Sequence, residues 1–135
     1  MNPQSSQPIK TEIGFLKGRD AIYLDKFDVA IQPATLELEG SFNGKLASKP
    51  TNEWIDYSII FSGVLAFKVI ELDLWDFSSA SSFDEVINSE WRSKLNGKVS
   101  PENKHYLIQT YDYVVEVICE RFLLTIKART KQGAE

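Results

Sequence analysis

The chain has 135 residues, a net charge of −4, an apolar content of 43% and an aromatic content of 12%. Such a chain fits one domain that buries roughly two-thirds of its unfolded surface, and it is too apolar to be disordered. It contains no uncharged apolar window of about 18 residues, and its N-terminus lacks the basic start and apolar run of a secretory signal. We therefore predict a soluble, cytoplasmic protein with one domain at residues 9–130 and loose tails at 1–8 and 131–135.

The acidic residues concentrate in the middle of the chain. Residues 51–90 carry eight acidic side chains and one basic side chain, Lys68, for a net charge of −7. This excess is compatible with a basic protein partner, or with a solvated face near one end of the fold. No cluster of Lys and Arg interleaved with aromatic residues is present, so we expect no nucleic-acid partner.

Residues 22–42 alternate between apolar and polar positions, as half-buried strands do. Apolar residues occupy even-numbered positions at Ile22 and Leu24 but odd-numbered positions at Phe27 and Val29. Because successive residues of a strand point to opposite faces, this change predicts a bulge or tight turn at Asp25-Lys26. The stretch "ATLELEGSF" then has period two, and the dipeptide Asn43-Gly44 favours a turn after it.

The segment "WIDYSIIFSGVLAFKVIELD" at residues 54–73 keeps its apolar residues at odd positions on both sides of Gly63. A two-residue hairpin turn at Ser62-Gly63 would mix apolar and polar side chains on one face. A single strand bent at Gly63 keeps one apolar face, and we therefore predict a bent strand.

One region has helical spacing. In "SSFDEVINSEWRSKLNG" the apolar residues recur at intervals of three and four, which indicates one face of a helix near residues 82–95. Ser82 and Glu85 have the spacing of a capping box, and Gly97 is typical of a helix end.

Toward the C-terminus, apolar residues occupy odd-numbered positions before Glu120-Arg121 and even-numbered positions after it. This change predicts a hairpin of strands at about 111–119 and 122–128. Asp112, between two tyrosines, has an even residue number like Glu116 and Glu120, so the three acids are expected on one face of the strand. Since burying an unpaired carboxylate costs several kcal/mol, we expect Asp112 to face solvent.

These patterns predict a mainly β (α+β) fold: an antiparallel β-sandwich or partly open barrel of about 7–8 strands with one amphipathic helix near 82–95. The predicted core comprises Ile55, Tyr57, Ile59, Phe61, Leu65, Phe67, Val86, Trp91, Val115, Val117, Phe122 and Leu124.

The sequence carries no motif with an established catalytic mechanism. Its one histidine, His105, and one cysteine, Cys119, are too few for a structural zinc site, and no G-x-S-x-G elbow or glycine-rich phosphate loop is present. We expect no metal and no cofactor, and Cys119 in an apolar strand predicts a buried, inert thiol. Asp73 and Asp76 are the best pair of acids for glycoside hydrolysis or cation binding.

Three hypotheses about function follow. The first is a non-catalytic protein-interaction module with an acidic surface and a basic partner, by analogy with immunity proteins that neutralise basic toxins. Its predicted surface consists of Glu71, Asp73, Trp75, Asp76 and Phe77. The second is a β-sandwich or barrel that holds an apolar ligand, and the third is an enzyme with dispersed carboxylates. A homodimer is compatible with all three.

Overall fold

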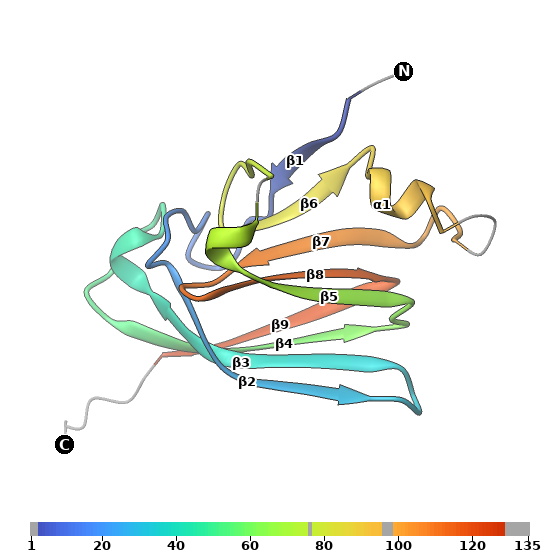
Figure 1. The fold of residues 1–135 in the computed structure, drawn as a ribbon. Helices are drawn as coiled ribbons and strands as arrows, with labels where there is room; N and C mark the ends of the chain where they lie inside the picture. The colour runs from blue at the N-terminus through green and yellow to red at the C-terminus, as the bar shows by residue number, and fades with distance from the viewer. Residues whose placement is uncertain (1–2, 76, 96–98, 129–135) are drawn as a thin grey trace.

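The computed structural model describes residues 3–75, 77–95 and 99–128. The chain forms two antiparallel β-sheets that pack against each other, with one short helix (Figure 1). This confirms the predicted β-sandwich class. The described residues form nine strands, more than the seven or eight expected.

The five-stranded sheet has the order β1-β6-β7-β8-β5, and the four-stranded sheet has the order β2-β3-β4-β9. The strands of the first are β1 (Ser5–Pro8), β6 (Phe83–Ile87), β7 (Lys104–Gln109), β8 (Tyr113–Cys119) and β5 (Ala66–Glu71). Those of the second are β2 (Ile22–Ala30), β3 (Thr35–Asn43), β4 (Trp54–Ser62) and β9 (Arg121–Ala128). The short helical elements are η1 (Gly44–Leu46), η2 (Leu72–Leu74) and α1 (Glu90–Ser93).

The N-terminal segment that we expected to be part of a loose tail contributes a strand. Residues 5–8 pair with residues 84–87 of β6, so β1 forms one edge of the five-stranded sheet. The C-terminal tail predicted at 131–135 lies outside the described residues.

The chain passes from one sheet into the other at three places, the first of them between β1 and β2. The change of direction predicted at Gly63 is confirmed, where φ is +65°, a conformation that glycine adopts without strain. The single bent strand expected there is instead two strands, β4 and β5, in different sheets. The hairpin predicted at 120–121 is wrong. β8 pairs with β5 and β7, while β9 pairs with β4, so the change after Glu120 marks the third crossing between the sheets.

The predicted helix at 82–95 is largely wrong. Residues 83–87 form strand β6, and only Glu90–Ser93 are helical. Phe83 and Val86 are both buried, but on opposite faces of the five-stranded sheet, so their spacing of three imitates a helical stripe. Ser82 is no helix cap; its hydroxyl donates to the Gly18 carbonyl at 2.9 Å, and Ser89 caps α1 instead.

The bulge predicted at Asp25-Lys26 is confirmed by the register of β2 against β3, which shifts between Leu24 and Lys26. Gly40 lies opposite Leu24. A Cβ atom on Gly40 would lie 1.9 Å from the Tyr23 carbonyl oxygen, so the bulged strand can approach β3 only at a glycine.

Most of the predicted core is buried between the sheets. Ile55, Tyr57, Ile59, Phe61, Val115 and Val117 are buried there, and Phe122 and Leu124 pack beside them half-buried. Val86 is buried on the outer face of the five-stranded sheet, and Trp91 is half-buried. Leu65 and Phe67 are exposed, which corrects the prediction, because β5 is the edge of its sheet. Among the described residues, no helix has the length and apolar character needed to cross a membrane.

Candidate functional site

A surface rich in aromatic and acidic side chains lies at one end of the sandwich. The start of β2, the start of β4, the β7–β8 turn and η2 meet there, at the left in Figure 1. We call Arg19, Tyr23, Trp54 and Tyr111 the aromatic stack.

The four side chains of the aromatic stack are in sequential contact. The Arg19 guanidinium lies 5.0 Å from the centre of the Tyr111 ring, a cation–π distance. Tyr111 stacks on Tyr23 with 5.2 Å between ring centres and 15° between planes, and Tyr23 meets Trp54 edge to face at 5.3 Å. Trp54 and Tyr111 remain 40% and 38% exposed, so both rings present contact area to solvent.

Backbone contacts hold the aromatic stack in place. The Tyr111 amide donates to the Ile22 carbonyl at 2.9 Å, which fixes the β7–β8 turn against β2. Arg19 Nε donates to the Tyr111 carbonyl at 3.2 Å. The Tyr57 hydroxyl donates to the Tyr23 carbonyl at 2.9 Å, at the β-bulge. The stack is therefore attached to both sheets.

Carboxylates surround the aromatic stack. Asp20, Asp73 and Asp112 are exposed, and Arg19 Nη1 lies 3.9 Å from Asp73 Oδ1. The pKa of Tyr23 is raised, first by burial and then by the negative charges of Asp20 and Asp112 and by Tyr111. The local potential is therefore negative, which favours cations.

The structure divides the surface predicted from residues 71–77. Glu71 and Asp73 are exposed beside the aromatic stack, where Glu71 Oε1 accepts the Asp73 amide at 3.1 Å. Trp75 and Phe77 are half-buried on the outer face of the five-stranded sheet. Asp76 lies outside the described residues.

Trp75 and Phe77 cover part of that outer face. They meet edge to face at 5.9 Å and pack against Leu107 and Val114. The indole Nε1 of Trp75 donates to Glu116 Oε2 at 3.3 Å. Both rings line a depression of about 270 Å³, which also includes Trp91.

A series of buried polar side chains, linked by hydrogen bonds, lies at the floor of this depression. His105 Nδ1 is 2.6 Å from the Ser89 hydroxyl, and His105 Nε2 is 2.7 Å from Glu116 Oε1. Lys68 Nζ lies 3.9 Å from Glu116 Oε2 and 4.5 Å from the centre of the Trp91 ring. Burial raises the pKa of Glu116, but its hydrogen bond to His105 and the charges of His105 and Lys68, with the Trp75 hydrogen bond, outweigh burial and leave that pKa lowered.

Ser89, His105 and Glu116 have the composition of a nucleophilic triad, but their contacts indicate a structural role. Ser89 Oγ accepts the Arg92 amide at 2.9 Å as the N-cap of α1. Its proton is then directed to His105 Nδ1, which leaves the Nε2 proton for Glu116. All three side chains are buried, so their hydrogen bonds attach α1 to the five-stranded sheet.

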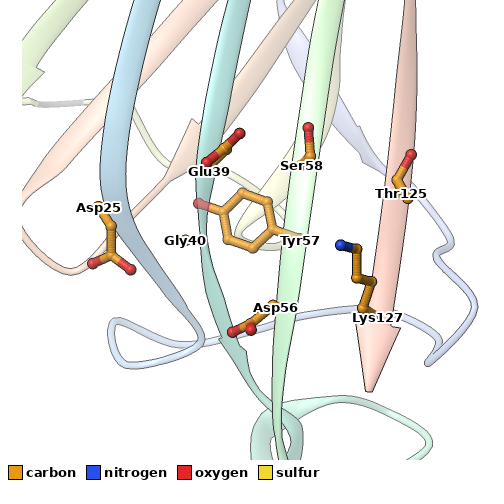
Figure 2. Close-up of a pocket in the computed structure, with 8 residues that line it drawn as sticks. All are labelled: Asp25, Glu39, Gly40, Asp56, Tyr57, Ser58, Thr125 and Lys127. Atoms are coloured by element: carbon orange, nitrogen blue, oxygen red, sulfur yellow. The ribbon is translucent and has the colours of Figure 1, made fainter. Parts of the chain in front are cut away.

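A second depression, of about 420 Å³, lies on the outer face of the four-stranded sheet (Figure 2). Asp25, Glu39 and Asp56 contribute carboxylates to its lining, and Lys127 contributes an ammonium group. Polar and apolar residues alternate along these strands, and the charged residues occupy polar positions. The depression is therefore the solvent-exposed face of a sheet that is buried on its other face.

The described residues offer no metal centre: no group of three or more His, Cys, Asp or Glu side chains converges among them. Cys119 is buried, as predicted, and burial raises the pKa of its thiol to about 12. A protonated, buried thiol is a poor nucleophile.

Comparisons with known proteins give no relative. No protein-family model matches the chain, and no curated protein and no solved structure is significantly similar to it.

The sequence did not reveal the aromatic stack, because its members lie on three separate segments. Arg19 and Tyr111 are 92 positions apart and meet only through the sheet topology. The available signal was the composition itself, since Trp, Tyr and Arg are enriched in interfaces.

Proposed function

We propose that this chain is a non-catalytic protein-binding module that recognises a basic protein through the aromatic stack and its surrounding carboxylates. The supporting observation is the stack itself: two rings, Trp54 and Tyr111, are each more than a third exposed, yet are held by defined ring contacts. Trp, Tyr and Arg supply most of the binding energy at protein interfaces.

The carboxylates define the chemistry of the partner. Asp20, Asp73, Asp112 and Glu71 are exposed around the stack, and Arg19 is the cation paired with Asp73 there. The contact between Arg19 and Tyr111 is a cation–π contact, and the cationic group of a partner's Arg or Lys can bind neighbouring rings in the same way.

The experiment is a selection from a displayed library of random peptides on immobilised wild-type protein. We expect the enriched peptides to be rich in Lys and Arg. Their affinity should fall at least about tenfold for Trp54→Ala, the loss typical of an interface anchor. Their association should also slow as NaCl rises from about 50 to about 500 mM, because salt screens exposed charges.

Leu123→Ala is the matched control, since Leu123 is exposed on β9 outside the stack. This variant should bind the selected peptides as wild type does. Enrichment of neutral or acidic peptides, or equal binding by Trp54→Ala, contradicts the proposed function.

A further inference from the structure

The two sheets have four edge strands, and three of them are protected. Proteins protect free edges with short strands, proline, bulges or charged side chains. β1 has four residues and ends at Pro8, and β2 contains the bulge next to Lys26. β9 carries Arg121 and Lys127 near its two ends.

The fourth edge, β5, has the fewest of these features: it has neither bulge nor proline, and its acidic residue, Glu71, is the last of the strand and accepts the Asp73 amide. Ala66–Glu71 pair with β8 in continuous register, and the strand contains no proline. Its one basic residue, Lys68, is held over the Trp91 ring and beside Glu116, on the outer face of the sheet. Lys68 therefore does not protect the edge in the way that a solvated lysine would.

Exposed apolar side chains lie along this edge. Phe67 and Val69 are opposite the core residues Val117 and Val115, so they point between the two sheets. On this side of the sandwich Phe67 meets Phe27 of β2 with 5.8 Å between ring centres, and residues of β2 and β5 line one depression. The exposed fractions range from 39% to 81% for a group that we call the β5 patch: Val29, Ile31, Leu65, Phe67 and Val69.

The lining of the depression beside this edge carries no charge. It has a volume of about 280 Å³ and consists of Val29, Ala30, Ile31, Ala34, Thr35, Val64, Leu65, Ala66 and Phe67. Such a surface selects neither a basic nor an acidic partner. In a chain of net charge −4, it is a surface on which two copies can meet without opposing carboxylates.

We propose that β5 pairs antiparallel with β5 of a second copy of this chain, so that the two β5 patches cover each other across a twofold axis. Such an isologous contact satisfies two unprotected edges at once, and twofold dimers are the commonest oligomers. This surface contains no residue of the aromatic stack and shares only Glu71, the last residue of β5, with the carboxylates around it, so the dimer does not depend on the proposed function.

The sequence of β5 selects the register of this pairing. Paired residues share a face of the sheet, so the twofold axis passes through a residue. Lys68 and Val69 are the two central residues of β5, so an axis at either one pairs most of the strand. An axis at Lys68 would place two lysines directly opposite each other, which is unfavourable. An axis at Val69 instead places Val69 opposite itself and Lys68 opposite Ile70 of the second copy.

The test is the mass of the protein in solution, measured by sedimentation equilibrium. We expect wild type at about 100 µM, a concentration at which edge pairing of micromolar affinity is populated, to have twice the chain mass of 15.3 kDa. Val69→Lys should have the mass of one chain. Leu123→Lys, which places the same charge on an exposed apolar position of β9, should remain dimeric.

A second measurement serves in case Val69→Lys does not fold. Under mild oxidation Val69→Cys should form a disulfide-linked dimer, whereas Leu123→Cys should not, because only residue 69 meets its own copy at the axis. A wild type that is monomeric at this concentration, a Val69→Lys variant that remains dimeric, or equal cross-linking of both cysteine variants overturns the proposal.

Discussion

The Tyr57 hydroxyl donates a hydrogen bond to the main-chain carbonyl of Tyr23, 2.9 Å away. The β-bulge next to Tyr23 interrupts the ladder between β2 and β3, and the Tyr57 hydroxyl supplies a donor to the carbonyl there. Because Tyr57 is part of the core and Tyr23 is part of the aromatic stack, this bond links the packing of the sandwich to the candidate binding surface.

Tyr57→Phe should lower the free energy of unfolding by about 1–3 kcal/mol, because it leaves the Tyr23 carbonyl without its donor in a half-buried place. Urea denaturation measures this change. Tyr113→Phe is the control: Tyr113 is exposed, so loss of its hydroxyl should leave the unfolding midpoint unchanged. Equal effects in the two variants would show that the bond contributes nothing.

The second prediction concerns the core. Phe61 is fully buried and lies 6.0 Å from Tyr106 and 6.3 Å from Phe122, measured between ring centres. Phe61→Ala should lower the free energy of unfolding by about 3–5 kcal/mol, since it leaves a cavity among these rings. Phe15→Ala makes the same substitution at an exposed position and should cost no more than about 1 kcal/mol. A thermal melt of Phe61→Ala close to that of wild type would contradict this.

The strands with one solvent-exposed face were predictable from the sequence, because apolar residues at every second position show which side of the strand is buried. The bulge at Asp25-Lys26 and the bend at Gly63 both follow from the parity of apolar residues. The same reasoning failed for β6, which was predicted as part of a helix, and for the pairing of β8, although the strand itself was predicted. The outer face of the five-stranded sheet is covered by Trp75, Phe77 and their neighbours, so strands there are apolar on both sides and lose the alternation.

The candidate site was predictable only where it is local in sequence. Glu71 and Asp73 are close neighbours of Trp75 and Phe77 in the sequence, so the sequence alone indicates acids beside aromatic residues. Tyr23, Trp54 and Tyr111 are brought together by strand pairing and by the turn between β7 and β8, and no short pattern in the sequence records this contact.

The third prediction concerns Ser89. Ser89→Ala removes both the cap of α1 and the partner of His105 Nδ1, and should lower the free energy of unfolding by about 1–3 kcal/mol. Ser78→Ala, at an exposed position, should have no measurable effect. Because Ser89 is structural, a fluorophosphonate probe should not label the wild-type protein. Labelling that is lost in Ser89→Ala would instead identify a nucleophile.

The last prediction concerns the pH dependence of stability. The pKa of Glu116 in the folded protein lies below its ordinary value of 4.5, because the contacts with His105, Lys68 and Trp75 outweigh the burial that raises it. A carboxylate whose pKa is depressed by folding stabilises the folded state above the pKa it has when unfolded. That stabilisation is lost as the pH falls through the folded pKa.

The free energy of unfolding should therefore decrease as the pH is lowered below about 4.5, and the decrease should be smaller in Glu116→Gln, which has no proton to gain at this position. Urea denaturation at a series of pH values from about 7 to about 3 measures both, with tryptophan fluorescence as the signal, because Trp75 donates to Glu116 and Trp91 lies beside His105. Glu120→Gln, at an exposed position next to Arg121, should keep the wild-type pH dependence. If Glu116→Gln keeps it as well, the acid sensitivity arises from other carboxylates, and the contact between His105 and Glu116 contributes no pH-dependent stability.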